Sequence, residues 1–171
     1  MELIRERLKI EEYNYPFADK VKSQLQSQIT LLSASGPSNI NAQFTGWELP
    51  GKEVDNIIKW ISNLITKDFV PDGGFTLKCS ELWGVLYKEG DYITEHDHSP
   101  SLYSFSYYVN VPKGSSPLVF VTSGRKIKPE EGKLVIFESR LLHKVPTNKC
   151  KDRCVISGNF IYDKEIGIYD K

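Results

Sequence analysis

The three histidines of the chain lie in two short segments that are far apart in the sequence. His96 and His98 flank Asp97 in the first segment, and His143 follows much later. Side chains two residues apart on an extended segment point to the same side, so His96 and His98 can converge on one point while Asp97 points away. A third histidine from a distant strand would complete one face of an octahedral metal ion. The remaining positions of the ion would then be open for a chelating co-substrate and O2.

Two other interpretations of these residues stay open at the level of the sequence. His96 and His98 can be exposed loop histidines with His143 a packed core residue, and each histidine taken alone favours such a role. Alternatively, a local bulge after His96 would turn Asp97 inward as the third ligand in place of His98. The three-histidine site is favoured because each histidine stands at the end of a strand-like run, and because Arg153 follows His143 by ten residues.

Arg153 begins a predicted strand and is a candidate group for binding an anion. If its side chain faces inward, alternate residues of the strand share its face, namely Val155, Ser157 and Asn159. The opposite layer then receives Cys154, Ile156 and Phe160. A guanidinium offers a planar fork that matches a carboxylate, and the small Val155 and Ser157 leave room for a bound molecule. The alternative is a surface ion pair between Arg153 and a neighbour such as Asp152.

The segments that must position these residues change character near Phe75. Before that point, a short strand is expected over residues 7–13, and two helical patterns follow, with a polar connector over residues 35–50 between them. The helical apolar positions are Val21, Leu25, Ile29 and Leu32 in the first pattern and Val54, Ile57, Ile58, Ile61 and Ile65 in the second. Pro71-Asp72-Gly73-Gly74 is expected to stop the second helix. After it, β-rich runs alternate with turns, over residues 76–87, 102–111, 118–122, 134–137 and 153–162. Such spacing indicates a sandwich or barrel, with the two helices covering one outer face.

The run over residues 102–111 separates into two faces. With Tyr108 inward, its face is shared by Leu102, Ser104 and Ser106. The opposite face is continuously apolar and consists of Tyr103, Phe105, Tyr107, Val109 and Val111. A face of that kind is suited to packing beneath the predicted helices.

Together these residues resemble the 2-oxoglutarate/Fe(II) oxygenase superfamily, in particular its prolyl-hydroxylase-like branch and small oxygenases of bacteria and bacterial viruses. In that superfamily a His-x-Asp/Glu pair, a distal His and a later Arg recur in this order. The matching positions here are His96, His98, His143 and Arg153. Three further runs match the strands around these positions, at residues 83–87 followed by Gly90, 106–112 and 131–137. The resemblance covers residues 76–162, about half of the chain.

The resemblance implies a mainly β fold with flanking helices (α+β), a double-stranded β-helix of the jelly-roll or cupin-like kind with two N-terminal helices packed on one sheet. It implies Fe(II) held by His96, His98 and His143, with 2-oxoglutarate and O2 as co-substrates. Arg153 would anchor the C5 carboxylate of 2-oxoglutarate, and Tyr108 is a second candidate for that contact. Tyr87 and Ser157 would also line the co-substrate site, although both tyrosines can instead be core aromatics. No catalytic residue is expected beyond the metal centre.

The implied reaction couples oxidative decarboxylation of 2-oxoglutarate to hydroxylation of a small-molecule or peptidyl substrate. The chain departs from the superfamily pattern at His98, where a carboxylate is usual. A rival interpretation is therefore a cupin-like three-histidine metal enzyme that does not use 2-oxoglutarate, such as a thiol dioxygenase or an isomerase. A third is a non-catalytic β-helix binding module. Arg153 favours 2-oxoglutarate, because a thiol dioxygenase needs no anchor for a dicarboxylate.

Composition narrows the partners and the compartment. The chain of 171 residues has 22 Lys plus Arg and 22 Asp plus Glu, so it lacks the surplus of basic residues found in most nucleic-acid binders. No nucleic acid is therefore expected as a partner. The three cysteines, Cys79, Cys150 and Cys154, indicate reduced thiols rather than a disulfide framework, with a metal pair at Cys150 and Cys154 as the alternative. The charged N-terminus and the lack of a long apolar run predict a cytoplasmic protein without membrane contact, as a monomer or homodimer.

A single domain is expected over residues 1–171. Residues 1–74 would hold the N-terminal strand and supporting helices, 75–163 the β-helix core and 164–171 a C-terminal tail. Candidate lid or substrate contacts are the connector around Phe44 and Trp47 and the strip Ser123-Gly124-Arg125-Lys126. The sequence does not identify the primary substrate.

Overall fold

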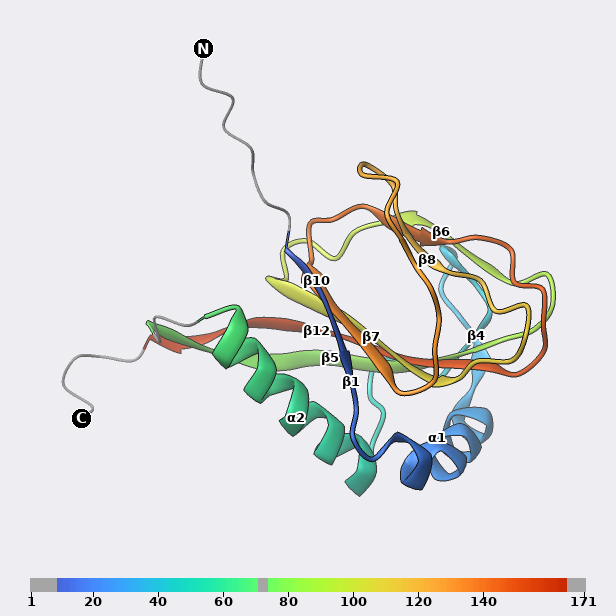
Figure 1. The fold of residues 1–171 in the computed structure, drawn as a ribbon, viewed down its shortest axis with the longest axis horizontal. Coiled ribbons are helices and arrows are strands. Elements are labelled where there is room, and N and C mark those ends of the chain that lie inside the picture. The colour runs from blue at the N-terminus through green and yellow to red at the C-terminus, as the bar shows by residue number, and fades with distance from the viewer. Residues whose placement is uncertain (1–8, 71–73, 166–171) are drawn as a thin grey trace, which may run out of the picture.

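Two antiparallel sheets and two helices build the part of the chain that this computed structural model describes, residues 9–70 and 74–165 (Figure 1). The seven-stranded sheet has the order β1 (Ile10–Asn14), β10 (Lys133–Glu138), β7 (Tyr103–Asn110), β12 (Arg153–Glu165), β5 (Phe75–Tyr87), β4 (Gln43–Phe44) and β2 (Ala34–Ser35). The five-stranded sheet has the order β3 (Ile40–Asn41), β6 (Tyr92–His96), β11 (His143–Val145), β8 (Leu118–Phe120) and β9 (Lys126–Ile127). The two sheets face each other across a shared core, which confirms the expected double-stranded β-helix.

Strand β12 organises the larger sheet because it pairs with β5 on one side and β7 on the other. Its register places Arg153 opposite Tyr87 on β5 and Val155 opposite Tyr108 on β7. Alternation along β12 then points Val155 into the space between the sheets, while Cys154, Ile156 and Phe160 join the core beneath the helices. The predicted division of this strand into two faces is confirmed.

The helices α1 (Ala18–Leu32) and α2 (Lys52–Asp68) lie on the outer face of the larger sheet, on the side away from β6 and β8 (Figure 1). Their apolar stripes match the predicted positions with two exceptions. Leu32 is 40% exposed, because it is the last residue of α1 and the chain leaves the helix there. Ile58 is only half-buried, at the margin of the α2 stripe. Of the predicted stop signal, Pro71, Asp72 and Gly73 lie outside the described residues, and α2 itself ends at Asp68.

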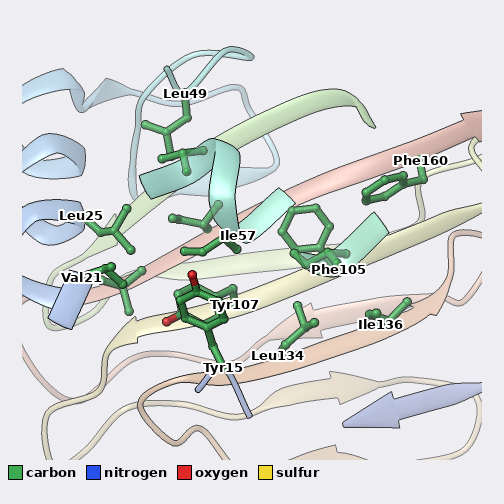
Figure 2. Close-up of a cluster of buried hydrophobic side chains, with 14 of the residues drawn as sticks. Tyr15, Val21, Leu25, Leu49, Ile57, Phe105, Tyr107, Leu134, Ile136 and Phe160 are labelled. Atoms are coloured by element: carbon green, nitrogen blue, oxygen red, sulfur yellow. The ribbon is translucent and has the colours of Figure 1, made fainter. Parts of the chain in front are cut away.

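The core beneath the helices joins both helices to β5, β7, β10 and β12 (Figure 2). Leu25, Ile29, Ile57 and Ile61 are fully buried in it. The sheet comes so close to α1 that a Cβ at Gly84 would lie 2.8 Å from the Ile29 side chain. Truncating a buried Ile or Leu to Ala in such a core costs about 2–5 kcal/mol, so this layer holds the sheet that carries the site.

Alternation along β7 is confirmed for the residues inside the strand. Phe105, Tyr107 and Val109 pack beneath the helices, and Tyr108 faces the other sheet. Val111 does not follow the prediction, since it packs against the core between the sheets. It lies beyond Asn110, the last residue of the strand, so the two-residue period no longer sets its direction.

The connector over residues 35–50 is more structured than predicted. The connector contains β3 and β4, and its first residue, Ser35, is the last residue of β2. These short strands extend both sheets. Two-residue strands have no measurable period, and distant partners decide their pairing. Of the short strand expected over residues 7–13, positions 7 and 8 lie outside the described residues, and β1 begins only at Ile10 and continues to Asn14. Strand β12 extends to Glu165, into the segment expected as a tail, and residues 166–171 are likewise outside the description.

Candidate metal and co-substrate site

The structure brings His96, His98 and His143 together at one end of the space between the sheets. His96 ends β6 and is the direct partner of His143, which begins β11. His98 follows two residues after the end of β6. One ligand atom from each of the three lies within 4.8 Å of the others, and the ring centroids are 4.4 to 5.0 Å apart. Three imidazoles at such separations can bind one metal ion together.

Backbone carbonyl groups orient two of the three imidazoles. Nδ1 of His96 lies 2.8 Å from the Thr94 carbonyl oxygen, and Nδ1 of His143 lies 2.7 Å from that of Leu141. A carbonyl oxygen only accepts, so Nδ1 carries the proton in both rings and the Nε2 lone pair is free for a metal. His98 makes no such ring contact within the described part of the chain, and its ring lies beside Trp83 at a centroid distance of 5.6 Å.

Burial keeps two of these imidazoles neutral. Desolvation, followed by the nearby His143 and His96, lowers the pKa of His98 to about 3. Desolvation and His96 likewise lower the pKa of His143 to about 4. Both side chains are therefore unprotonated near pH 7, which is the form that binds a metal.

Asp97, the alternative third ligand, is not part of the histidine cluster. Its side chain is exposed and accepts a hydrogen bond of 2.9 Å from the Ser99 backbone N–H. That hydrogen bond is the main reason why the pKa of Asp97 is lowered. The carboxylate thus caps a turn of the backbone, and it is not one of the grouped ligand atoms.

A cavity of about 210 Å³ connects the histidines with Arg153. This is smaller than the roughly 300–1,000 Å³ of pockets for drug-sized ligands, so it suits a small co-substrate and the reacting part of a second molecule. Its wall includes Trp83, Val85, Tyr87, Tyr108, Val155 and Ser157. Of the described residues that line it, only Asp97 is acidic.

Arg153 is buried in this cavity without a counter-ion. The residue is 1% exposed, and its Nε and Nη1 have no hydrogen-bond partner among the described residues. Its guanidinium carbon lies 4.1 Å from the ring centre of Tyr87 and 5.7 Å from that of Tyr108. Aromatic faces stabilise a cation only in part, and a buried charge without a hydrogen-bonded partner is costly. The surface ion pair that the sequence left open is therefore not formed.

Tyr108 and Ser157, two further candidates for co-substrate contact, face the same cavity. The Tyr108 hydroxyl is buried without a partner in the described chain, and burial raises the pKa of this phenol to about 12 although Arg153 opposes the shift. Ser157 Oγ lies 3.2 Å from Ser106 Oγ on the neighbouring strand. The Tyr108 hydroxyl group can donate a hydrogen bond, and the Arg153 cation lies next to it. Together they can bind an anionic ligand.

Both predicted and unforeseen residues line the rest of the cavity. Trp47, from the predicted lid segment, lines it together with Trp83, and their ring centroids are 5.3 Å apart. Phe44 instead lies in the core between the sheets. Trp83 was not predicted, although it shares a strand face with Tyr87, and that two-residue alternation was the available signal. Asn39 and Ile40 also line the cavity, and no sequence signal indicated them.

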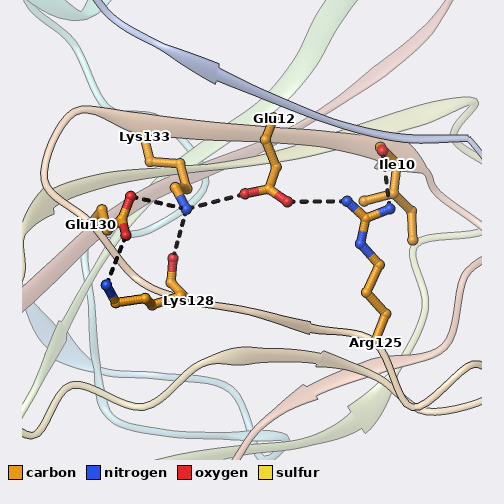
Figure 3. A network of polar contacts seen from close by, with 6 residues as sticks. All are labelled: Ile10, Glu12, Arg125, Lys128, Glu130 and Lys133. Atoms are coloured by element: carbon orange, nitrogen blue, oxygen red, sulfur yellow. Dashed lines mark hydrogen bonds and ion pairs between the residues drawn. The ribbon is translucent and has the colours of Figure 1, made fainter.

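The strip Ser123–Lys126 does not line this cavity, and its role as a lid or substrate contact stays a prediction. Arg125 instead extends across to β1, where it binds the Glu12 carboxylate at 3.0 Å and the Ile10 carbonyl oxygen at 3.3 Å (Figure 3). The β8–β9 hairpin thereby joins the edge of the larger sheet. The cysteines are unpaired, and Cys154 lies in the core beneath the helices, so it forms no metal pair with Cys150.

Comparison with known proteins identifies the class of fold. No family model and no curated protein sequence matches the chain. Among solved structures, a viral collagen prolyl hydroxylase from Paramecium Bursaria Chlorella virus-1 in complex with 2OG has 18% identity and a TM-score of 0.72, over 93% of this chain and 98% of that one. A Pseudomonas putida prolyl-4-hydroxylase has 19% identity and a TM-score of 0.72, over 92% and 94%. HygX from Streptomyces hygroscopicus, with nickel and 2-oxoglutarate bound, has 11% identity and a TM-score of 0.62, over 90% and 82%.

The chain therefore has the fold of the 2-oxoglutarate/Fe(II) oxygenases, as the resemblance implied. At these identities the likeness shows the fold, and the function has to be argued from the site. Neither helix of the described chain combines the length and the apolar character needed to cross a membrane.

Proposed function

We propose that the protein is an Fe(II)- and 2-oxoglutarate-dependent oxygenase, a hydroxylase acting on a small-molecule or peptidyl substrate. The observation that carries this proposal is the presence of two complementary groups in one small cavity. Three imidazoles converge at one end, and the buried guanidinium of Arg153 lacks a carboxylate partner among the described residues. A dicarboxylate that chelates a metal through one end would supply that partner through the other.

The residues present fit both groups. His96, His98 and His143 would hold Fe(II), and Arg153 with the Tyr108 hydroxyl would hold the C5 carboxylate of 2-oxoglutarate. When bound, iron and 2-oxoglutarate supply the activation of O2 that protein side chains cannot perform. The chain contributes the orientation of the imidazoles through Thr94 and Leu141, and a narrow, largely apolar cavity that excludes bulk water.

The exposure of Trp47 and the kinds of protein that share the fold support the proposed type of substrate. Trp47 lines the cavity and is 52% exposed, so we propose that a substrate approaches the histidines past this ring. Two of the solved structures that share the fold are prolyl hydroxylases. We therefore propose a C–H bond of a peptidyl or small-molecule substrate as the site of reaction, with hydroxylation as the outcome.

The test is the formation of succinate from 2-oxoglutarate by the purified protein with Fe(II) in air. We expect slow formation without a primary substrate, and none from His143→Ala under the same conditions. Metal binding without any succinate, even at saturating 2-oxoglutarate, would replace the proposal by a three-histidine enzyme of another kind. A protein that binds no metal would be a non-catalytic binding module.

A further inference from the structure

We infer that Ser139, fixed by Ser104 and Asn159, is the positioning residue for His98. The inference rests on the proposed metal site and adds a function for a group of buried polar residues outside the cavity. Ser139, Ser104 and Asn159 are at most 2% exposed, and none of them lines the cavity.

His98 is the one histidine of the three that needs an external anchor. His96 and His143 belong to paired strands, and a backbone carbonyl orients each ring. His98 lies beyond the end of β6, in the turn that leads to β7, without a ring hydrogen bond in the described chain. Its backbone N–H donates to the Ser139 carbonyl oxygen at 2.8 Å. The position of His98 therefore depends on the position of Ser139.

Ser139 is itself held by a directional chain of hydrogen bonds. Ser139 Oγ lies 2.7 Å from Ser104 Oγ, which donates to Asn159 Oδ1 at 2.8 Å. Asn159 Nδ2 donates in turn to the Glu81 carboxylate at 2.6 Å. Because the carboxylate can only accept, it fixes which way the amide points, and the hydroxyl groups must donate in sequence toward it.

The chain of hydrogen bonds crosses the sheet that carries the site. It begins in the loop between β10 and β11, passes through β7 and β12, and ends on β5. The backbone supports the same arrangement, since the Ser139 N–H donates to the Leu102 carbonyl oxygen at 3.0 Å. Loss of one hydroxyl group would leave a buried acceptor or donor unsatisfied and would loosen the loop on which His98 rests.

A metal titration with Ni(II) as the probe tests this positioning role, since Ni(II) binds imidazole firmly. Ser139→Ala should lower the Ni(II) affinity of the chain by about 10-fold to 100-fold, the usual effect of removing a group that orients a ligand. Ser104→Ala should act in the same direction and serves as the second variant if Ser139→Ala does not fold. Ser116→Ala is the matched control, because Ser116 is buried and its hydroxyl group donates to the carbonyl oxygen of Thr147, which lies beyond the opposite end of β11 from His143.

A double-mutant cycle with His98 separates positioning from general destabilisation. In the His98→Ala background, Ser139→Ala should change the remaining Ni(II) affinity by less than about twofold, because the group that it positions is absent. Equal losses in both backgrounds, or a loss of the same size in Ser116→Ala, would overturn the inference. If wild-type protein binds Ni(II) and Ser139→Ala binds it equally well, only this inference fails. If wild-type protein binds no metal, the proposed function fails and the inference with it.

Discussion

Two buried cations of this molecule have opposite surroundings. Lys133 is 9% exposed, and its ammonium group contacts Glu12 at 3.1 Å, Glu130 at 3.2 Å and the Lys128 carbonyl oxygen at 3.0 Å (Figure 3). Burial by itself would lower the pKa of Lys133, but the two carboxylates raise it. Arg153 is buried more deeply, beside two tyrosine rings, and has no carboxylate partner among the described residues.

The comparison indicates that the charge of Lys133 stabilises the fold, whereas the charge of Arg153 is available to bind a ligand. Every charged group in the network around Lys133 has a partner of opposite charge within it, and the network joins β1, β10 and the β8–β9 hairpin. Arg153 lowers the free energy of unfolding of the ligand-free protein, because a desolvated charge without a partner is unfavourable. A bound anion would remove this penalty. The same reasoning applies to the histidines, whose ligand atoms lie within 4.8 Å of one another. Variants on each side of this comparison should therefore behave differently.

Loss of a metal ligand should have the largest effect. His143→Ala should abolish binding of Fe(II), or of Mn(II) as its surrogate, since two remaining histidines rarely hold iron firmly. One metal ion per wild-type chain, measured by anaerobic titration, is the reference. Lys133→Met is the control from the other side of the comparison and should bind metal normally. An unchanged metal stoichiometry in His143→Ala would exclude the three-histidine site.

The identity of the third ligand should produce the next largest effect. His98→Ala should lower iron affinity sharply, while Asp97→Ala should be mild because its exposed carboxylate only caps a turn. His98→Asp should retain the metal, since it restores the carboxylate that is usual in the superfamily. Anaerobic metal titration of the three variants decides the question. Iron lost in Asp97→Ala but kept in His98→Ala would show that Asp97 is the ligand.

Removal of the cation in the cavity should affect the co-substrate and spare the metal. Arg153→Ala should bind Fe(II) normally and lose 2-oxoglutarate affinity by about 2–5 kcal/mol, or roughly 30-fold or more. Arg153→Lys should recover only part of the loss, because an ammonium group cannot form the planar fork. Calorimetric titration of the metal-loaded protein measures both. Wild-type affinity in Arg153→Ala would refute the anchor.

Stability without ligands should distinguish the two cations directly. Arg153→Met should leave the free energy of unfolding unchanged or raise it by about 1 kcal/mol or more, because an unpaired buried charge is replaced by apolar atoms. Lys133→Met should lower it by up to about 1 kcal/mol, since Glu12 and Glu130 each lose one of the two cations that they contact, and keep Arg125 and Lys128 respectively. Urea unfolding of the ligand-free proteins provides both values. A clear loss of stability in Arg153→Met would show that Arg153 has an internal partner after all.

The smallest expected effect is an acid dependence of the Lys133 network. Burial opposes the shift, but the hydrogen bonds from Lys133 and Arg125 leave the pKa of Glu12 below its usual value of 4.5. A folded pKa below the unfolded one stabilises the fold above the unfolded pKa, and this contribution disappears as the pH falls through the folded pKa. Because the Glu12 side chain is 36% exposed, we expect less than about 1 kcal/mol. Comparing Glu12→Gln with wild type in urea unfolding between pH 7 and the acid range, roughly pH 3, tests it.

The sequence by itself determined the features that follow from short-range periods. Alternation in β7 and β12 placed Tyr108 and Val155 on the inner face, and helical spacing identified the buried stripes of α1 and α2, because these periods are set by local backbone geometry. The spacing of His96 and His98 indicated a shared direction for the same reason. The ordered motif then implied the double-stranded β-helix, which the structure confirms.

Only the tertiary structure decided which distant groups meet. Three examples are the pairing of His96 with His143, the lack of hydrogen-bond partners for Arg153 Nε and Nη1 among the described residues, and the extension of Arg125 to Glu12. The helical and strand periodicity of the sequence carries no information about such contacts, so β3 and the cavity wall at Asn39 and Ile40 could not be predicted. The anchoring of His98 through Ser139, Ser104 and Asn159 is of the same kind. Each of these residues looks ordinary in the sequence, and their hydrogen bonds exist only because three strands and a loop converge.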